Sequence, residues 1–172
     1  MPRPHTDEYA DFYAGYVGQV PEDDILPVLV AQVGELERLR EAIPAEREAF
    51  RYAEGKWSVR EMLGHLSDAE RVFGYRAWRV SRNDKTPLPG FDQNPYIDES
   101  GYDQVPANEL IDELLHLRHS NLAVLSRLRD EQWTRSGVAS GTPITVRALA
   151  FILAGHIRHH AKVLRERYGI EI

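Results

Sequence analysis

The chain has 172 residues, of which 42% are hydrophobic and 28% charged, with a formal net charge of −6. This composition is typical of a globular protein and excludes wholesale disorder, and the length suits one domain, residues 1–172. Acidic residues are interspersed with arginines along helical patterns and no basic stripe occurs, so no nucleic-acid partner is expected. The sequence contains no cysteine, which excludes disulfides, thiolate metal sites and a cysteine nucleophile.

The first twenty residues lack the apolar core of a secretory signal, and no run of about 18 apolar residues occurs anywhere. We therefore expect a cytoplasmic protein with no membrane partner. Aromatic residues recur in this region at helical spacing: Tyr9, Phe12, Tyr13 and Tyr16. Because aromatic stripes are usually buried, residues 1–20 are expected to form an extension that packs on the domain instead of binding a cofactor.

Two helices are predicted in the first half of the chain. The first spans residues 25–43, ends before Pro44 and carries an apolar face made of Leu29, Val33, Leu36 and Leu39. The second spans residues 59–81 and begins at a capping box, in which Ser58 and Glu61 satisfy each other's free backbone N–H groups. Its apolar stripe contains His65 among Met62, Leu66, Ala69 and Phe73.

A connection rich in Pro, Gly and Asp follows, over residues 83–106. It is much longer than the turns that usually join adjacent helices, so it either covers a binding site as a lid or crosses the bundle as a plain connection. If it is a lid, four of its side chains are candidates for substrate contact: Phe91, Asp92, Tyr96 and Tyr102.

Two further helices are predicted in the second half. One spans residues 107–129, with Leu110, Leu114, Leu117, Val124 and Leu128 toward the core, and a short element at 130–133 and a turn-rich segment at 136–143 follow it. The last helix begins after the cap Thr145 and ends at about Tyr168, before Gly169. Strand signals are weak throughout. The predicted fold is therefore all-α: a four-helix bundle with a long connection between its second and third helices.

The histidines carry the chemical signal. His156 and His160 are four residues apart, so both rings project from one face of the last helix, within the apolar stripe that should face inward. The pair alone is weak evidence for a metal, because such spacing occurs by chance. His65 strengthens it, since packing the second helix against the last would bring three imidazoles together. Three neutral imidazoles suit Zn, Ni, Cu or Fe, with Zn or Ni preferred. In contrast, His159 is expected to point outward, and His116 and His119 to lie on the surface.

At two places the residues resemble a known family. The segment Tyr52–Glu61 with its Gly55-Lys56-Trp57-Ser58 start, the following Gly64–Glu70, and the ending Gly155-His156-Ile157-Arg158-His159-His160 are similar to the DinB/YfiT-like superfamily. The resemblance extends from about residue 16 to the end of the chain.

The resemblance implies a four-helix bundle whose metal-binding histidines correspond to His65, His156 and His160. Members with known chemistry are thiol S-transferases or thiol-dependent isomerases that use a low-molecular-weight thiol, and homodimers are common. We therefore expect a metal-dependent enzyme that acts on a small-molecule substrate by activating a thiol or water, and a homodimer. The alternatives are a non-catalytic metal-binding or structural dimer and a metal-dependent hydrolase.

Such chemistry needs a proton acceptor near the metal. Asp68 lies one turn beyond His65 and is the predicted catalytic residue, with a solvated helix acid as the alternative. Glu70 points to the other side of its helix and should pair with an arginine. Arg76 is expected in a surface ion pair or as an anchor for an anionic substrate, and Trp57 as a hydrophobic anchor of the helix start.

Overall fold

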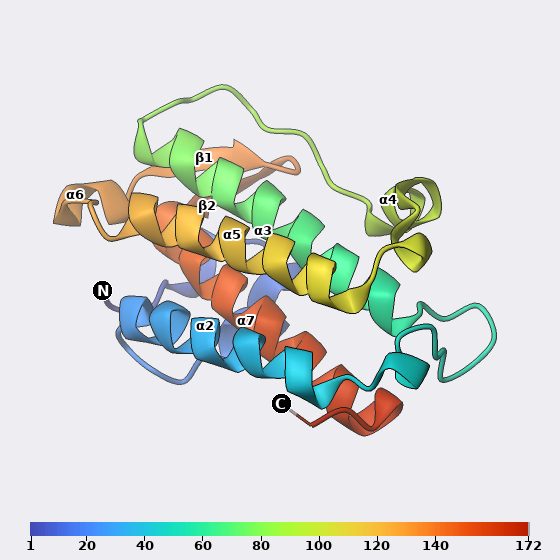
Figure 1. Cartoon of the computed structure of the whole chain (residues 1–172). Helices are drawn as coiled ribbons and strands as arrows, with labels where there is room; N and C mark the ends of the chain where they lie inside the picture. Colours follow the sequence, from blue (N-terminus) through green and yellow to red (C-terminus); the bar gives the residue numbers. More distant parts are fainter. Residues whose placement is uncertain (172) are drawn as a thin grey trace.

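The computed structural model describes residues 1–171, and four long helices form its frame (Figure 1). These are α2 (Ile25–Ala42), α3 (Val59–Ser81), α5 (Ala107–Leu125) and α7 (Val146–Val163), and a π-helical turn at Leu164–Tyr168 continues α7. The predicted four-helix bundle is therefore confirmed, and its helices begin and end close to the predicted residues.

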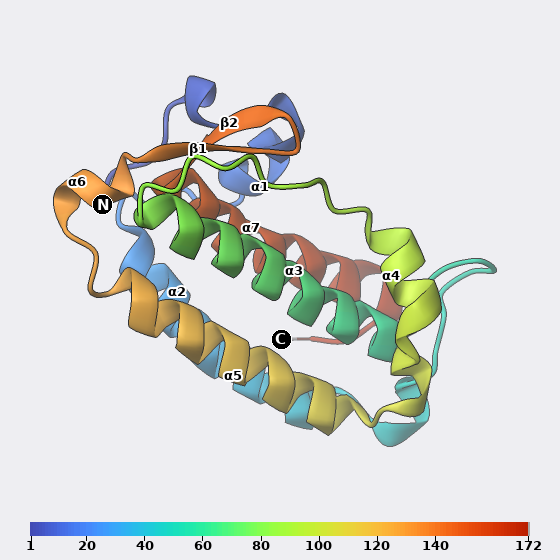
Figure 2. The same ribbon diagram turned by 90° about the horizontal axis from the view of Figure 1, so that it is seen from above.

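Of the long helices that follow one another in the chain, only α3 and α5 are neighbours in the bundle. Both α2 and α3 pack against α5 and α7, so α2 and α3 face each other across the bundle (Figure 2). The long connection after α3 runs back along the bundle to the end where α3 begins, so that α5 packs beside α3 and runs parallel to it (Figure 1). Helix α3 lies antiparallel to α7, which places the first turns of α3 beside the last turns of α7 (Figure 1).

Local signals explain where the two site-bearing helices begin and end. The Ser58 hydroxyl accepts from the backbone N–H of Glu61 at 3.1 Å, and the Glu61 carboxylate accepts from that of Ser58 at 2.7 Å, which completes the predicted capping box. Thr145 caps α7 by accepting from the N–H of Ala148. Gly169 follows Tyr168 with φ +64°, the left-handed conformation that glycine adopts without strain.

A polar layer divides the core into two apolar clusters. One cluster surrounds Leu149–Ala154 on α7, and the other surrounds Leu63 on α3 and Leu110 on α5. Between them each of the four long helices contributes buried polar side chains: Gln32, His65, Glu70, Arg118, His156 and His160. Because buried polar groups are costly unless they have partners, this layer is the first place to look for function.

The N-terminal segment packs along α7 and the hairpin (Figure 2). It contains short helical turns at Thr6–Glu8 and Asp11–Tyr13, followed by α1 (Ala14–Gly18). The Glu8 carboxylate accepts from the Thr145 hydroxyl and the Arg147 guanidinium at 2.7 Å each. Gly155 permits the close approach, since a Cβ there would collide with the backbone carbonyl of Tyr16.

Regions outside the bundle differ from the sequence expectation. Residues 83–106 are not a plain loop: α4 (Gln93–Ser100) forms within them, capped by Asp92 and ended by Gly101 at φ +68°. Pro95 concealed this helix, although proline is tolerated in a first turn. The segment 136–143, expected only as a turn, contributes to the antiparallel hairpin β1 (Ser136–Ala139) and β2 (Thr142–Thr145). Ser140 and Gly141 close it with positive φ, as in a type I′ turn.

Two smaller features complete the fold. The short helix α6 (Asp130–Trp133) forms where a short element was expected. The buried face of α5 is wider than the predicted stripe, because α5 packs on both α2 and α3; Leu117, Val124 and Leu128 are only half-buried, while Ile111, Leu115 and Leu125 are buried. Within residues 1–171, none of the helices combines the length and the hydropathy that a membrane crossing requires.

Candidate metal centre

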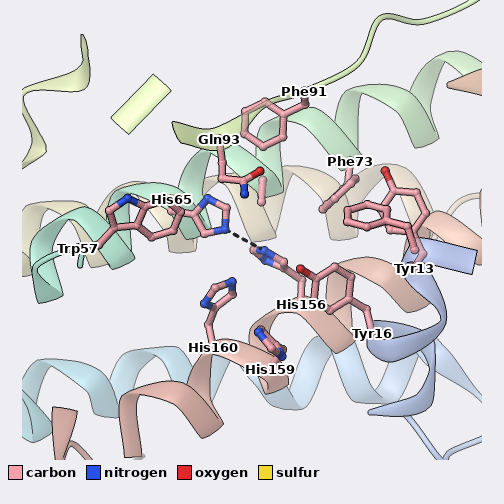
Figure 3. Close-up of a pocket in the computed structure, with 12 residues that line it drawn as sticks. Tyr13, Tyr16, Trp57, His65, Phe73, Phe91, Gln93, His156, His159 and His160 are labelled. Carbon is pink, nitrogen blue, oxygen red and sulfur yellow. Dashed lines mark hydrogen bonds between the residues drawn. The ribbon is translucent and has the colours of Figure 1, made fainter. Parts of the chain in front are cut away.

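Three histidines converge between α3 and α7. His65 and His156 face each other with their Nε2 atoms 3.1 Å apart, and one ligand nitrogen from each of His65, His156 and His160 lies within 4.8 Å of the others (Figure 3). The three side chains are 6%, 4% and 8% exposed. The structure therefore brings together the three residues that helical spacing selected.

The geometry fits a metal ion. Two imidazole nitrogens bound to one tetrahedral zinc lie about 3.4 Å apart, close to the separation of His65 and His156. The Nδ1 atoms of His65 and His160 are buried and have no hydrogen-bond partner within residues 1–171. Buried polar atoms without partners are rare in folded proteins. These three imidazoles could hold a divalent ion, whose identity the donor set does not fix.

Burial keeps the three rings neutral, which is the form that binds metals. Burial, together with the charge that His159 would carry, lowers the pKa of His65 to about 4. Burial and the neighbouring histidines also hold the pKa values of His156 and His160 well below the ordinary value. At neutral pH no proton therefore competes with an ion for these nitrogens.

An aromatic cavity of about 240 Å³ opens over the histidines. Its walls contain Phe12, Tyr13, Tyr16, Trp57, Phe73 and Phe91, together with Ala69 and Gln93, and in the described part of the chain no Asp, Glu, Lys or Arg side chain lines it. Trp57 lies at one end and Tyr13 at the other, as Figure 3 shows. The Trp57 ring is 4.8 Å from that of His65, and the Tyr16 ring is 5.2 Å from that of His156. A ligand of the histidines on this side therefore contacts several aromatic rings.

His159 is a correction to the sequence analysis. It was expected to point outward, but it is half-buried and lines the cavity, with its ring centroid 4.9 Å from that of His160 and 5.4 Å from that of Tyr16. The N-terminal segment packs over this side of α7 and converts an exposed face into a wall. His159 nevertheless remains outside the three-histidine cluster.

The structure does not bring Asp68 into the cavity. Its carboxylate accepts from the Tyr102 hydroxyl at 2.8 Å and lies 3.8 Å from Arg71, in a separate groove beside α4. Burial raises the pKa of Asp68. Gly64 makes room for the Tyr102 ring against α3, since a Cβ there would meet it. The position of Asp68 thus does not support the catalytic role predicted for it.

The remaining polar candidates have structural partners. Glu70 forms a buried ion pair with Arg118, as expected of a residue on the far side of α3. Arg76 is neither in a surface ion pair nor in the cavity wall: it is 2% exposed and donates to the Tyr13 hydroxyl and the Pro89 carbonyl. His116 and His119 are exposed on α5, as predicted.

Among the four candidates in the long connection, only Phe91 lines the cavity. Tyr96 packs on the Phe91 ring at 4.9 Å, Tyr102 binds Asp68, and Asp92 caps α4. Sequence reasoning missed Gln93 and assigned Trp57 and the N-terminal aromatic residues to packing alone. The aromatic spacing of the N-terminal segment was the available signal for part of this wall, but spacing does not tell a core contact from a cavity wall.

Comparisons with known proteins agree with this architecture. YfiT from Bacillus subtilis, described as a probable metal-dependent hydrolase with an unusual four-helix bundle topology, matches with a TM-score of 0.69 and 18% identity, over 98% of this chain and 94% of that one. The mycothiol-dependent maleylpyruvate isomerase matches with a TM-score of 0.69 and 12% identity, over 90% of this chain and 63% of that one. At such identities these likenesses show the fold alone. No curated protein matches the chain. The family model of the DinB superfamily matches residues 29–164, which is most of the sequence, and the chain belongs to this superfamily.

Proposed function

We propose that the protein is a metal-dependent enzyme that activates a thiol for transfer to a small electrophile at the three histidines. The observation that carries the proposal is a set of three buried imidazoles at one wall of an aromatic cavity, with no fourth histidine or carboxylate in the cluster among residues 1–171. Structural zinc sites usually have four protein ligands, so a three-ligand cluster beside a cavity favours a catalytic site over a structural one.

The ion would supply one thing: it lowers the pKa of a thiol or water that binds it, so that the nucleophile forms near neutral pH. The thiol then loses its proton to solvent, its sulfur bonds to the electrophilic carbon, and the leaving group departs with the electron pair of its bond. Each further contribution comes from the residues of the chain.

The cavity walls bind and orient the electrophile. The rings of Phe73 and Phe91 offer apolar contact and exclude water from the reacting atoms. Burial raises the pKa of Tyr16, so its hydroxyl stays protonated and can donate to an acceptor on the ligand. The amide of Gln93 is another neutral hydrogen-bonding group in the wall.

A hydrolase is the second candidate, because water could take the place of the thiol at the same histidines. The description of YfiT as a probable metal-dependent hydrolase supports this alternative through the shared fold. Either enzyme uses one divalent ion per chain. A homodimer, which the family resemblance implies, is a further prediction that sedimentation velocity measures.

The test is thiol conjugation. Protein loaded with zinc or nickel is incubated with a bimane electrophile and a panel of thiols, and conjugation is followed by fluorescence. We expect conjugation above the metal-free control for at least one thiol, and the rate should fall at least about 100-fold in His156→Ala, which lacks one of three ligands.

His116→Ala is the matched control, since this exposed histidine on α5 lies outside the cavity and should leave the rate unchanged. Equal rates with and without metal for every thiol would contradict the transferase. If activated esters are hydrolysed in the same metal-dependent way while no thiol is conjugated, the hydrolase takes its place.

A further inference from the structure

A second groove reaches the histidines from another side. It has a volume of about 290 Å³ and is lined by Lys56, Asn94, Val163 and Tyr168, among others. His160 and Trp57 line both this groove and the aromatic cavity, so these two side chains form the partition between them. Along Gly55, Lys56, Trp57 and Asn94 the groove continues outward into a wider polar depression of about 570 Å³.

The two openings differ in charge. Among residues 1–171 no Lys, Arg, Asp or Glu lines the aromatic cavity, whereas Lys56 lines the groove. Lys56 forms no salt bridge with any carboxylate of residues 1–171. Arg51, in the outer depression, is already neutralised by Glu61 and Asp103.

The inner part of the groove is therefore positively charged. Asp98 lines only the outer depression, so the charge beside His160 is set by Lys56. A cation in a recess attracts anionic ligands, and an exposed ammonium is free to follow the ligand that it binds.

We propose that this groove is a second binding site, which admits a polar, anionic ligand to the histidines across Trp57 and His160 from the aromatic cavity. The inference rests on the proposed function, because the histidines are then the meeting point of two ligands. A neutral, apolar electrophile occupies the aromatic cavity, and the nucleophile arrives through the groove.

Two separate routes favour transfer over hydrolysis. A hydrolase needs only water as its second reactant, and water needs no recess of about 290 Å³ beside a lysine. A transferase must hold two organic molecules at once, and separate openings prevent each from blocking the other.

The experiment uses three small thiols that differ in charge: 3-mercaptopropionate, 2-mercaptoethanol and cysteamine. The full chain is loaded with Co(II), and thiol binding is measured from the change in its visible absorption. We expect affinity to fall in that order, from the anionic to the neutral to the cationic thiol.

Charge variants identify the residue. Lys56→Glu should lower the affinity for 3-mercaptopropionate by about fivefold to tenfold, as expected for reversing an exposed charge. The affinity for 2-mercaptoethanol should change by less than about twofold. Lys56→Met should give an intermediate loss. Lys85→Glu is the control, since Lys85 lies beside the hairpin, donates to the Ser136 carbonyl and lines neither opening. Equal affinities of all three thiols, or an unchanged preference in Lys56→Glu, would overturn the assignment.

The two-route arrangement has its own readout. Indole, a neutral aromatic compound, should occupy the aromatic cavity without displacing 3-mercaptopropionate. If the two ligands exclude each other, the proposal of two routes is wrong. Failure of Co(II) to bind would instead refute the metal site of the proposed function. The Lys56 preference is then measured on the metal-free chain by ligand-detected NMR, where loss of the preference for the anionic thiol overturns it.

Discussion

Two buried polar clusters lie side by side in the polar layer of the bundle. In the first, Arg118 on α5 donates to both carboxylate oxygens of Glu70 on α3, at 2.8 and 2.9 Å. It also donates to Gln32 on α2, whose amide donates in turn to the carbonyl of Ala154 on α7. In the second cluster, His65, His156 and His160 meet nitrogen to nitrogen, and two ring nitrogens have no partner.

The difference separates a structural cluster from a ligand site. The Glu70 cluster is neutral overall and joins all four long helices, so it is complete without any ligand. The histidine cluster joins only α3 and α7 and brings the Nε2 atoms of two imidazoles within 3.1 Å of each other, which is an arrangement that a cation between them would complete. Both clusters are equally buried, so burial alone does not reveal function.

The largest effect should come from removing one charge of the first cluster, so that its buried partner is left unpaired. Glu70→Ala strands the guanidinium of Arg118, which is fully buried. We expect the free energy of unfolding to fall by about 3–5 kcal/mol, measured by urea denaturation. The double variant Glu70→Leu with Arg118→Met removes both charges and should recover more than half of that loss. A loss below about 1 kcal/mol in the single variant would contradict the structural role.

Lowering the pH should reduce the stability of the protein mainly through the second cluster. In the metal-free protein the pKa of His65 is about 4 when folded, below its ordinary value of 6.5, so the unfolded chain binds more protons between these values. Stability is therefore full above pH 6.5 and decreases as the pH falls toward 4, by about 3 kcal/mol from His65 alone. Denaturation at several pH values measures it, and His65→Leu should flatten the profile. A flat profile for the unaltered chain would refute the argument.

Zinc should stabilise the protein through the second cluster only. At 100 times its dissociation constant, an ion that binds only the folded state adds about 2.7 kcal/mol, which appears as a rise in melting temperature. His156→Ala and His160→Ala should abolish this rise. His159→Ala should retain it, because His159 lies outside the cluster although it lines the cavity. If either of the first two variants still shows the full rise in melting temperature, the three histidines are not the zinc site.

The smallest effect concerns the wall above the histidines. Gly155→Ala places a methyl group against the Tyr16 carbonyl, so the N-terminal segment must shift; we expect a loss of about 1–2 kcal/mol and faster proteolysis within residues 1–20. Gly15→Ala is the matched control on the other side of this contact, since a Cβ at Gly15 meets nothing within 4 Å. Equal behaviour of the two variants would show that the close approach is unimportant.

The helical parts of the site followed from the sequence because they depend on local rules. The 3.6-residue period placed His65, His156 and His160 on inward faces, and the Ser58 capping box fixed where α3 begins. The inward position of Glu70 required a partner, and an arginine supplied it.

The cavity wall was not predictable because it depends on contacts between distant segments. Glu8 holds the N-terminal segment through Arg147, which lies 139 residues away along the chain, and this docking turns Tyr16 toward His156 and covers His159. Asp68 has the expected spacing from His65, but Tyr102 binds its carboxylate in another groove, and spacing on one helix contains no information about that neighbour.

The segment that Glu8 anchors supplies part of the cavity wall but none of the three histidines. The three histidines belong to α3 and α7, whereas Phe12, Tyr13 and Tyr16, which shape the space above them, belong to a stretch before residue 29, where the family match begins. The histidines and one part of the aromatic wall thus lie in separate stretches of the chain, while Trp57, Phe73 and Phe91 complete the wall from within the family match. Substitutions at Phe12 or Tyr16 would alter the cavity without replacing a histidine, which makes this segment the natural starting point for redesign.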